Sequence, residues 1–235
     1  MRVSRSSVFP HIRGFKLVPT TNPVALGWCG QTLDFTGNTN SSPPAGWVSM
    51  LIGSGPGIVG DKLVGSPSSF QYKGGVKLYS GAITMPADVR SVIVEYDSFR
   101  TYSDAYQYNS VAFKSNTGIY WSFKDDITDG AYNSHDFGWY RYRQGNEFSD
   151  HVAYYDEYKY QYVNMGLGLF KTRLTVRDGG VEWLVKDVET GVETTISIAL
   201  PPEFRIADLV GASVGALSVG SGSTWMDNVK IQCLR

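Results

Sequence analysis

The chain has 235 residues, of which 42% are hydrophobic and 18% are charged, and its formal net charge is −1. This composition is typical of a folded globular protein and argues against intrinsic disorder. A chain so close to neutral has no overall field that would attract nucleic acid or an anionic membrane, so we expect neither as a partner. No apolar run approaches the roughly 18 residues that a membrane span needs.

The first 33 residues contain four basic residues and no acidic one, and three prolines interrupt any hydrophobic period. We therefore expect an extended N-terminal arm over residues 1–30 and one folded domain over residues 31–235. Such an arm should not be ordered alone, so we expect it to lie against another subunit or protein of an oligomer or larger assembly. The expected anchoring residues are Arg2, Arg5, Phe9, Arg13 and Phe15.

Export through a secretory leader is not expected. Pro10, His11 and Arg13 interrupt the only apolar stretch near the N-terminus that could act as one. The chain would then remain in the cytoplasm of the cell that makes it, unless a leader has been lost.

Short runs with a period of two follow one another through most of the domain, which predicts β-strands. The expected strands are 89–99, 110–114, 119–123, 137–143, 152–163, 169–177, 181–188, 193–200, 210–219 and 224–232. Turn residues at 116–118 and at 179–180 predict two hairpins, and a short helix over 202–209 would not alter this pattern. Many short strands without an amphipathic helix predict an all-β fold of two stacked antiparallel sheets.

Alternation also predicts which side chains share a face. In 89–99, Val92, Val94 and Tyr96 should lie on one face and Glu95 and Asp97 on the other. In the last strand we expect Trp225, Asp227, Val229 and Ile231 on one side.

Three segments carry a family resemblance. They are LDFTG at 33–37 with PPAGW at 43–47, FKTRLTV at 170–176 with VEW at 181–183, and WMDNVKI at 225–231. Together they resemble the opening, the penultimate hairpin and the closing strand of concanavalin A-like (laminin G-like) jelly-roll domains, over roughly residues 31–235. The resemblance implies a two-sheet antiparallel β-sandwich. Such domains occur in glycan-binding modules, glycosidases, polysaccharide lyases and bacteriophage surface proteins, so the fold does not fix the function.

The strongest catalytic candidate is the strand that carries Glu95 and Asp97. The resemblance to retaining glucanases implies a Glu at position one, an Asp at three and a Glu at six, but Arg100 occupies the sixth position here. Arginine stays protonated and cannot donate a proton in catalysis. We therefore interpret Glu95 and Asp97 as a polar pair on a solvent-facing strand, and His135 as a loop residue. We expect a non-catalytic protein.

Aromatic residues are the densest chemical feature. The candidate ligand-binding residues are Trp121, Trp139, Tyr140, Tyr142, Tyr154, Tyr158 and Tyr160. Rings beside hydrogen-bonding groups suit a sugar, and they suit a protein interface equally well. The alternative for each ring is an ordinary core or cross-strand position.

Two smaller features involve the chain ends. Some jelly rolls join their first and last strands through calcium, which makes Asp34 and Asp227 candidate ligands, and no other cofactor is expected. Cys29 and Cys233 could pair if those strands were neighbours. Without an export signal, two unpaired thiols are favoured.

These observations favour a bacteriophage virion component, such as a capsid decoration, head fibre or tail protein. It would assemble in the host cytoplasm, bind other virion proteins through its arm, and display a lectin-like sandwich toward host glycans. The first alternative is a carbohydrate-binding module of a secreted or surface protein, located outside the cell. The second is a glycoside hydrolase or polysaccharide lyase with a degenerate site.

Overall fold

The computed structural model describes residues 26–53, 55–66, 73–101, 107–129, 134–143, 155–219 and 222–235. The candidate anchoring residues Arg2, Arg5, Phe9, Arg13 and Phe15 lie outside the described residues, and so does Tyr154.

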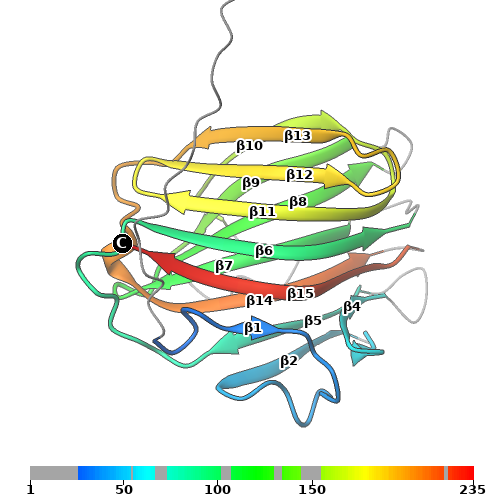
Figure 1. Cartoon of the computed structure of the whole chain (residues 1–235), viewed down its shortest axis with the longest axis horizontal. Helices are drawn as coiled ribbons and strands as arrows, with labels where there is room; N and C mark the ends of the chain where they lie inside the picture. Colours follow the sequence, from blue (N-terminus) through cyan, green and yellow to red (C-terminus); the bar gives the residue numbers. More distant parts are fainter. Residues whose placement is uncertain are drawn as a thin grey trace, which may run out of the picture.

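Two antiparallel sheets lie face to face, as predicted for an all-β sandwich (Figure 1). The eight-stranded sheet runs β13 (Glu193–Ala199), β12 (Gly180–Asp187), β11 (Gly168–Arg177), β6 (Ser91–Arg100), β15 (Thr224–Leu234), β4 (Lys62–Gly65) and β3 (Gly57–Val59), and β1 (Thr32–Leu33) also pairs with β15. The seven-stranded sheet runs β10 (Glu157–Asn164), β9 (Ser134–Tyr142), β8 (Tyr120–Asp129), β7 (Gln107–Ser115), β14 (Leu209–Val219), β5 (Lys73–Ser80) and β2 (Trp47–Gly53). The predicted fold class is confirmed.

Both expected hairpins form. Asn116, Thr117 and Gly118 lie between β7 and β8, and Asp178 and Gly179 lie between β11 and β12. Gly118 and Gly179 have φ angles of 83° and 79°, a left-handed conformation that glycine adopts without steric cost. The strand expected over 152–163 begins instead at Glu157.

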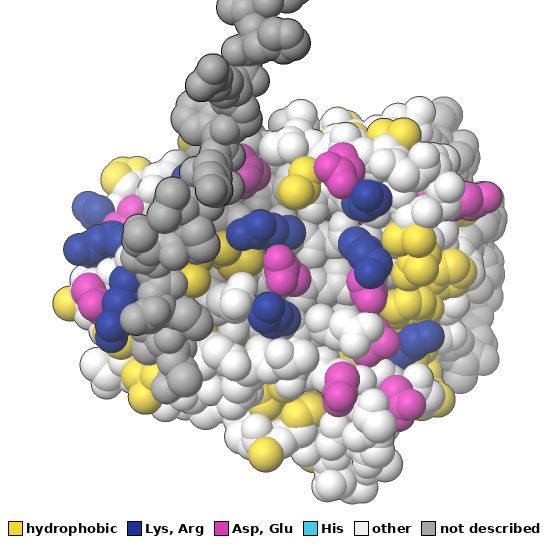
Figure 2. All heavy atoms as spheres, viewed as in Figure 1, with side chains coloured by type: hydrophobic (Ala, Val, Ile, Leu, Met, Phe, Trp, Pro, Cys, Tyr) yellow, Lys and Arg dark blue, Asp and Glu magenta, His cyan; other side chains and the backbone are white. Residues whose placement is uncertain are grey.

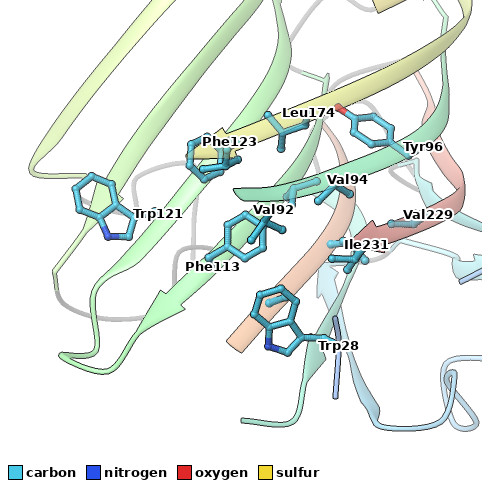
Figure 3. Close-up of a cluster of buried hydrophobic side chains, with 14 of the residues drawn as sticks. Trp28, Val92, Val94, Tyr96, Phe113, Trp121, Phe123, Leu174, Val229 and Ile231 are labelled. Atoms are coloured by element: carbon cyan, nitrogen blue, oxygen red, sulfur yellow. The ribbon is translucent and has the colours of Figure 1, made fainter. Parts of the chain in front are cut away.

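The core lies between the sheets and consists of alternate side chains from both (Figure 3). On β6, Val92, Val94 and Tyr96 are buried, as the alternation predicted. Opposite them, Phe113 and Phe123 meet with ring centroids 5.9 Å apart. Burial of one such side chain contributes about 1.5–3 kcal/mol to stability, so this alternating contact surface holds the sheets together.

The last strand corrects one expectation. A bulge between Asp227 and Lys230 shifts the register of β15 against β6, and Asn228 at its centre has a φ of 51°. The bulge reverses the alternation, so Met226 and Val229 both face the core. Trp225 and Asp227 therefore do not share a side with Val229 and Ile231, as had been expected.

The two ends of the described chain meet. Thr32 and Leu33 pair with Lys230 and Val229, and a disulfide joins Cys29 to Cys233 with their Cα atoms 5.4 Å apart. The favoured interpretation of two unpaired thiols was therefore wrong, because β1 and β15 bring the cysteines together across 204 positions of sequence. Beside this disulfide, Trp28 is buried and its ring packs against Phe113.

Helix is limited, in the part of the chain that the structure describes, to one 3-10 turn at Ile206–Asp208. None of the described helical structure is long and apolar enough to cross a membrane.

Candidate functional site

One face of the seven-stranded sheet points away from the core, and we call it the outer face. Its membership follows from the strand register, because directly paired residues point to the same side. Tyr140 on β9 pairs with Tyr158 on β10 and with Ser122 on β8, whereas Trp139 and Phe123 point into the core. The outer face includes Tyr108, Ser110, Ser122, Lys124, Asp126, Asp136, Tyr140, Tyr142, Tyr158, Tyr160 and Tyr162.

Five tyrosine rings follow one another along the β10 side of this sheet, namely Tyr140, Tyr155, Tyr158, Tyr160 and Tyr162, which we call the tyrosine row. The rings of Tyr140, Tyr158 and Tyr160 are nearly parallel, with centroids 5.9 and 5.7 Å apart. Tyr155 and Tyr162 meet Tyr158 and Tyr160 edge to face, at 4.8 and 5.1 Å. Tyr155, Tyr158, Tyr160 and Tyr162 are 44, 48, 39 and 60% exposed. Four of the five tyrosines in the row are therefore exposed to solvent over more than a third of their surface.

A glycine makes room for this arrangement. A Cβ atom on Gly138 would lie 2.7 Å from the Cβ atom of Tyr160 on the neighbouring strand. Because real Cβ atoms do not approach so closely, any side chain at this position would displace Tyr160 from its stack.

Lys124 holds the inner end of the row. Its ammonium group lies 4.6 Å from the ring centroids of both Tyr108 and Tyr140, and it donates a 2.9 Å hydrogen bond to the hydroxyl of Tyr142. A cation over an aromatic face is attracted by the ring quadrupole, more so when little water is present. The buried Lys124 therefore fixes the positions of three rings.

Next to Lys124, Asp126 is buried, and burial raises its pKa from 3.8 to about 7. The charges of Lys124 and Arg100 oppose this rise, while those of Asp136 and Asp125 add to it. Among the described residues, Asp126 Oδ1 and the hydroxyls of Ser110 and Ser122 have no hydrogen-bond partner. Buried polar atoms usually have a hydrogen-bond partner. The buried part of the outer face around Ser110, Ser122, Lys124 and Asp126, which we call the floor, can therefore form further hydrogen bonds.

Not every predicted aromatic residue lies on this face. Trp121 and Trp139 are core residues, with ring centroids 5.8 Å apart, and the indole of Trp139 donates a 3.0 Å hydrogen bond to the carbonyl of Ala199. Tyr142 faces outward but is buried. The alternation of side chains along a strand groups these residues by face, but it does not show which of the two faces is buried in the core. Binding by Tyr140, Tyr158 and Tyr160, which do lie in the row, stays a prediction.

Sequence reasoning also missed members of the site. Tyr155 was not among the candidate residues; it precedes β10, and its ring packs against that of Tyr158. Tyr162 shares the predicted side of Tyr158 and could have been included on that signal. Lys124 and Asp126 carried no signal, because their position depends on the register between β8 and β9.

Glu95 and Asp97 lie on the opposite surface of the molecule, on the solvent-facing side of the eight-stranded sheet. Figure 2 shows this surface, on which Lys and Arg side chains are interspersed with Asp and Glu side chains. Glu95 lies 3.8 Å from Arg173 and 3.9 Å from Lys230, and Asn228 donates a 3.0 Å hydrogen bond to Asp97. An open pocket of about 570 Å³ is lined by Glu95, Asp97, Arg173 and Asn228 together with Lys171 and Lys186. The surface there alternates basic and acidic groups, consistent with a polar pair on an exposed strand.

Arg100 lies on the other side of β6 and enters the core. Its guanidinium is 2.6 Å from a carboxylate oxygen of Asp125, and His135 is 3.2 Å from the other oxygen. His135 is therefore a buried strand residue and not a loop residue as expected, and its Nε2 donates a 2.6 Å hydrogen bond to the Gly166 carbonyl. Burial opposes ionisation of Asp125, but Arg100 and His135 lower its pKa below the usual range. The cluster joins β6 to β8 and β9.

Asp34 and Asp227 come close together through the pairing of β1 with β15. Burial raises the pKa of Asp227, the Asn228 amide and Lys62 oppose this, and the charges of Asp97 and Asp34 add to the rise. Each carboxylate also accepts a hydrogen bond from a nearby backbone amide. Within the described residues, no group of three or more His, Cys, Asp or Glu side chains is placed to hold a metal ion. A structural calcium between these aspartates stays a prediction.

No family model and no curated protein matches the chain. Several solved structures have a similar fold. The CBM2 module of the evolved Dit protein of Lactobacillus casei BL23 phage J-1 aligns with a TM-score of 0.60 at 9% identity, over 88% of this chain and 96% of that chain. The Lotus tetragonolobus seed lectin aligns at 0.57 and 9% identity, over 87% and 99%. The carbohydrate recognition domain of Emp47p aligns at 0.54 and 13% identity, over 88% and 95%. At such identities the likeness concerns the fold alone, and the chain has the concanavalin A-like, lectin-type jelly-roll fold.

Proposed function

We propose that the chain is a non-catalytic glycan-binding protein and that the tyrosine row is its binding surface. The observation that carries this proposal is the row itself, with four partly exposed tyrosines beside a floor that retains unpaired polar atoms. Sugars present C–H faces that pack against aromatic rings and hydroxyls that need polar partners. The phenol groups of Tyr158, Tyr160 and Tyr162 supply both kinds of contact within one row.

A place in a bacteriophage virion is the setting we propose. One of the similar folds is a module of a phage Dit protein, and others belong to lectins. A disulfide persists in oxidising surroundings, which include virion surfaces. In this proposal the basic segment that contains Arg2, Arg5 and Arg13 binds other virion proteins, and the sandwich displays the tyrosine row to glycans of the host surface.

The test of glycan binding is an array of bacterial and eukaryotic glycans, followed by calorimetry with any glycan that binds. Tyr158→Ala and Tyr160→Ala should each weaken binding by about tenfold, the effect of losing roughly 1.4 kcal/mol of ring contact. Leu184→Ala is the matched control, because Leu184 is a partly exposed apolar residue on the other sheet. Absence of binding to every glycan, or equal loss in the control, would refute the proposal.

The virion setting has its own test. A chain that lacks residues 1–25 keeps Trp28 and Cys29, and so keeps the packing and the disulfide at that end. This truncated chain should still bind glycans but should no longer enter phage particles, as judged by immunoblotting of purified particles. Equal incorporation of the truncated chain would remove the anchoring role and favour the alternative, a carbohydrate-binding module outside the cell.

The remaining alternative is an enzyme that uses Glu95 and Asp97. Both lie on the face opposite the tyrosine row, among basic side chains. Cleavage of a bound glycan by the purified chain, abolished in Glu95→Gln, would replace the binding proposal with this one.

A further inference from the structure

A pocket of about 200 Å³ lies where the ends of β5 and β7 meet the beginnings of β8 and β14, and we call it the Gly211 pocket. Its lining includes Tyr79, Lys114, Tyr120 and Gly211. It belongs to the outer face, because Lys114 pairs with Tyr120 in the same register that places Ser122 there. β8, β7, β14 and β5 are neighbours in the seven-stranded sheet, whereas the tyrosine row follows β9 and β10 (Figure 1).

The base of the pocket is open because residue 211 is a glycine. A Cβ atom at this position would lie 3.7 Å from the Cβ atom of Lys114 and 3.9 Å from the hydroxyl of Ser80, which are ordinary van der Waals distances. The backbone of Gly211 is also outside the left-handed region. Neither its conformation nor a close contact therefore requires glycine here, and a side chain would occupy the space of the pocket.

Contacts within the sheet hold the walls in place. The hydroxyl of Ser80 accepts a 2.9 Å hydrogen bond from the amide of Ala212, which ties the end of β5 to the beginning of β14. The ammonium group of Lys77 lies 5.7 Å from the ring centroid of Tyr79, and this ring also packs against a small apolar cluster on the outer face. The pocket is therefore formed before any ligand binds, as is usual for small-molecule sites.

Among the described residues that line the pocket, only Lys114 carries a charge. Its ammonium group lies 5.5 Å from the ring centroid of Tyr120 on the paired strand. Lys114 is exposed, and no carboxylate of the described chain forms an ion pair with it. The pocket thus joins two aromatic side chains to one unneutralised positive charge, a combination that favours a negatively charged ligand with an apolar face.

We propose that the Gly211 pocket binds a single sugar ring that carries a carboxylate, such as a uronic acid. Tyr79 and Tyr120 contact the C–H faces of the ring, and Lys114 pairs with the carboxylate. The pocket is smaller than the roughly 300 Å³ at which sites for drug-sized ligands begin, so it holds one ring. It lies apart from the tyrosine row, so its occupation does not depend on glycan binding there.

The test is a titration of the full, isotope-labelled chain, followed through its backbone amide signals in NMR spectra. The acidic ligands are the methyl glycosides of glucuronic, galacturonic and N-acetylneuraminic acid, and the comparison ligands are methyl glucoside, methyl galactoside and acetate. At least one acidic glycoside should shift the amides of Lys114, Gly211 and Ala212. It should bind about tenfold more tightly than the neutral glycosides, which lack the charge-assisted hydrogen bond, and than acetate, which lacks the ring.

Variants separate the space, the charge and the place of binding. Gly211→Leu should abolish binding because its side chain fills the pocket, and Gly211→Ala should weaken it less. Lys114→Met should lower the affinity for the acidic glycoside to that of a neutral one. Lys186→Met, which removes an exposed lysine of the other sheet, is the matched control and should change nothing. Tyr158→Ala should also leave this binding unchanged. Thermal unfolding of each variant shows whether the fold is kept.

Three results would overturn the proposal. The first is the absence of shifts around Gly211 with all three acidic glycosides. The second is equal affinity for acidic and neutral glycosides, or an acidic preference that survives Lys114→Met. The third is binding that persists in folded Gly211→Leu but is lost in Tyr158→Ala, which would place the sugar in the tyrosine row and support only the function proposed above.

Discussion

At the scale of single residues, the ion pair of Arg100 and Asp125 has the largest expected effect. Both side chains are buried, 2.6 Å apart. Arg100→Met leaves an uncompensated charge in the core, so it should lower the free energy of unfolding by about 3–5 kcal/mol. Arg173→Met, which removes the exposed 3.8 Å contact with Glu95, should cost no more than about 1 kcal/mol. Urea unfolding at pH 7 measures both, and equal losses would contradict the assigned role.

Asp126 makes a prediction about pH. Its pKa is raised from 3.8 to about 7 in the folded chain, so the folded state holds a proton that the unfolded state releases. Stability from this group is therefore lost as pH rises from about 4 through 7. Asp126→Asn cannot ionise, and its unfolding free energy should fall less than that of wild type between pH 5 and pH 8. The same decrease in both proteins would show that Asp126 does not titrate in this range.

Residue identity alone predicted part of the site. The spacing of Tyr158 and Tyr160 placed them on one side of a strand, and the structure does so. The same spacing could not show that Trp121 and Trp139 face the core, because both sheets contain aromatic strands and burial depends on the layer that packs against them.

At the scale of elements, the bulge in β15 depends on Asn228, whose φ is 51°. Asparagine tolerates the left-handed conformation, whereas a branched side chain costs about 1–2 kcal/mol there. Asn228→Val should lower the melting temperature, and Asn228→Gly should lower it less, although both lose the hydrogen bond to Asp97. Calorimetric melting compares them. If valine were tolerated as well as glycine, the left-handed backbone would not constrain this position.

At the same bulge, the predicted alternation of buried and exposed side chains along β15 fails. Trp225 and Met226 are both apolar, and Asp227 and Asn228 are both polar, so the period of two is interrupted here, but the prediction continued the alternation across them. In contrast, the hairpins around Asn116–Gly118 and Gly179 were predictable, because turn residues separate two runs of period two. The place of Lys124 and Asp126 in the floor of the outer face was not predictable, because it depends on how the strands pair.

At the scale of the whole molecule, the disulfide closes a loop of 204 positions between Cys29 and Cys233. Restricting so long a loop in the unfolded chain should stabilise the protein by about 2–5 kcal/mol. Cys29→Ala with Cys233→Ala should lower the melting temperature, and a reductant should lower that of wild type but not that of the double variant. A melting temperature unaffected by both changes would mean that the bond contributes nothing to stability.

The overall fold was the most predictable level. Repeated short strands and the absence of amphipathic helices suffice to predict stacked sheets. The disulfide was not predictable in the same way, because it depends on the contact between β1 and β15, which only the complete topology creates.

The bond between Cys29 and Cys233 also determines how the molecule responds to mechanical force. Tension applied through the N-terminal segment reaches Cys29 and crosses a covalent bond into β15. Within its sheet, β15 is hydrogen-bonded on both sides, to β6 and to β1 and β4. A pull on the arm would thus load an interior strand of the sheet and leave the intervening strands slack, so the sandwich would resist peeling from its N-terminal end.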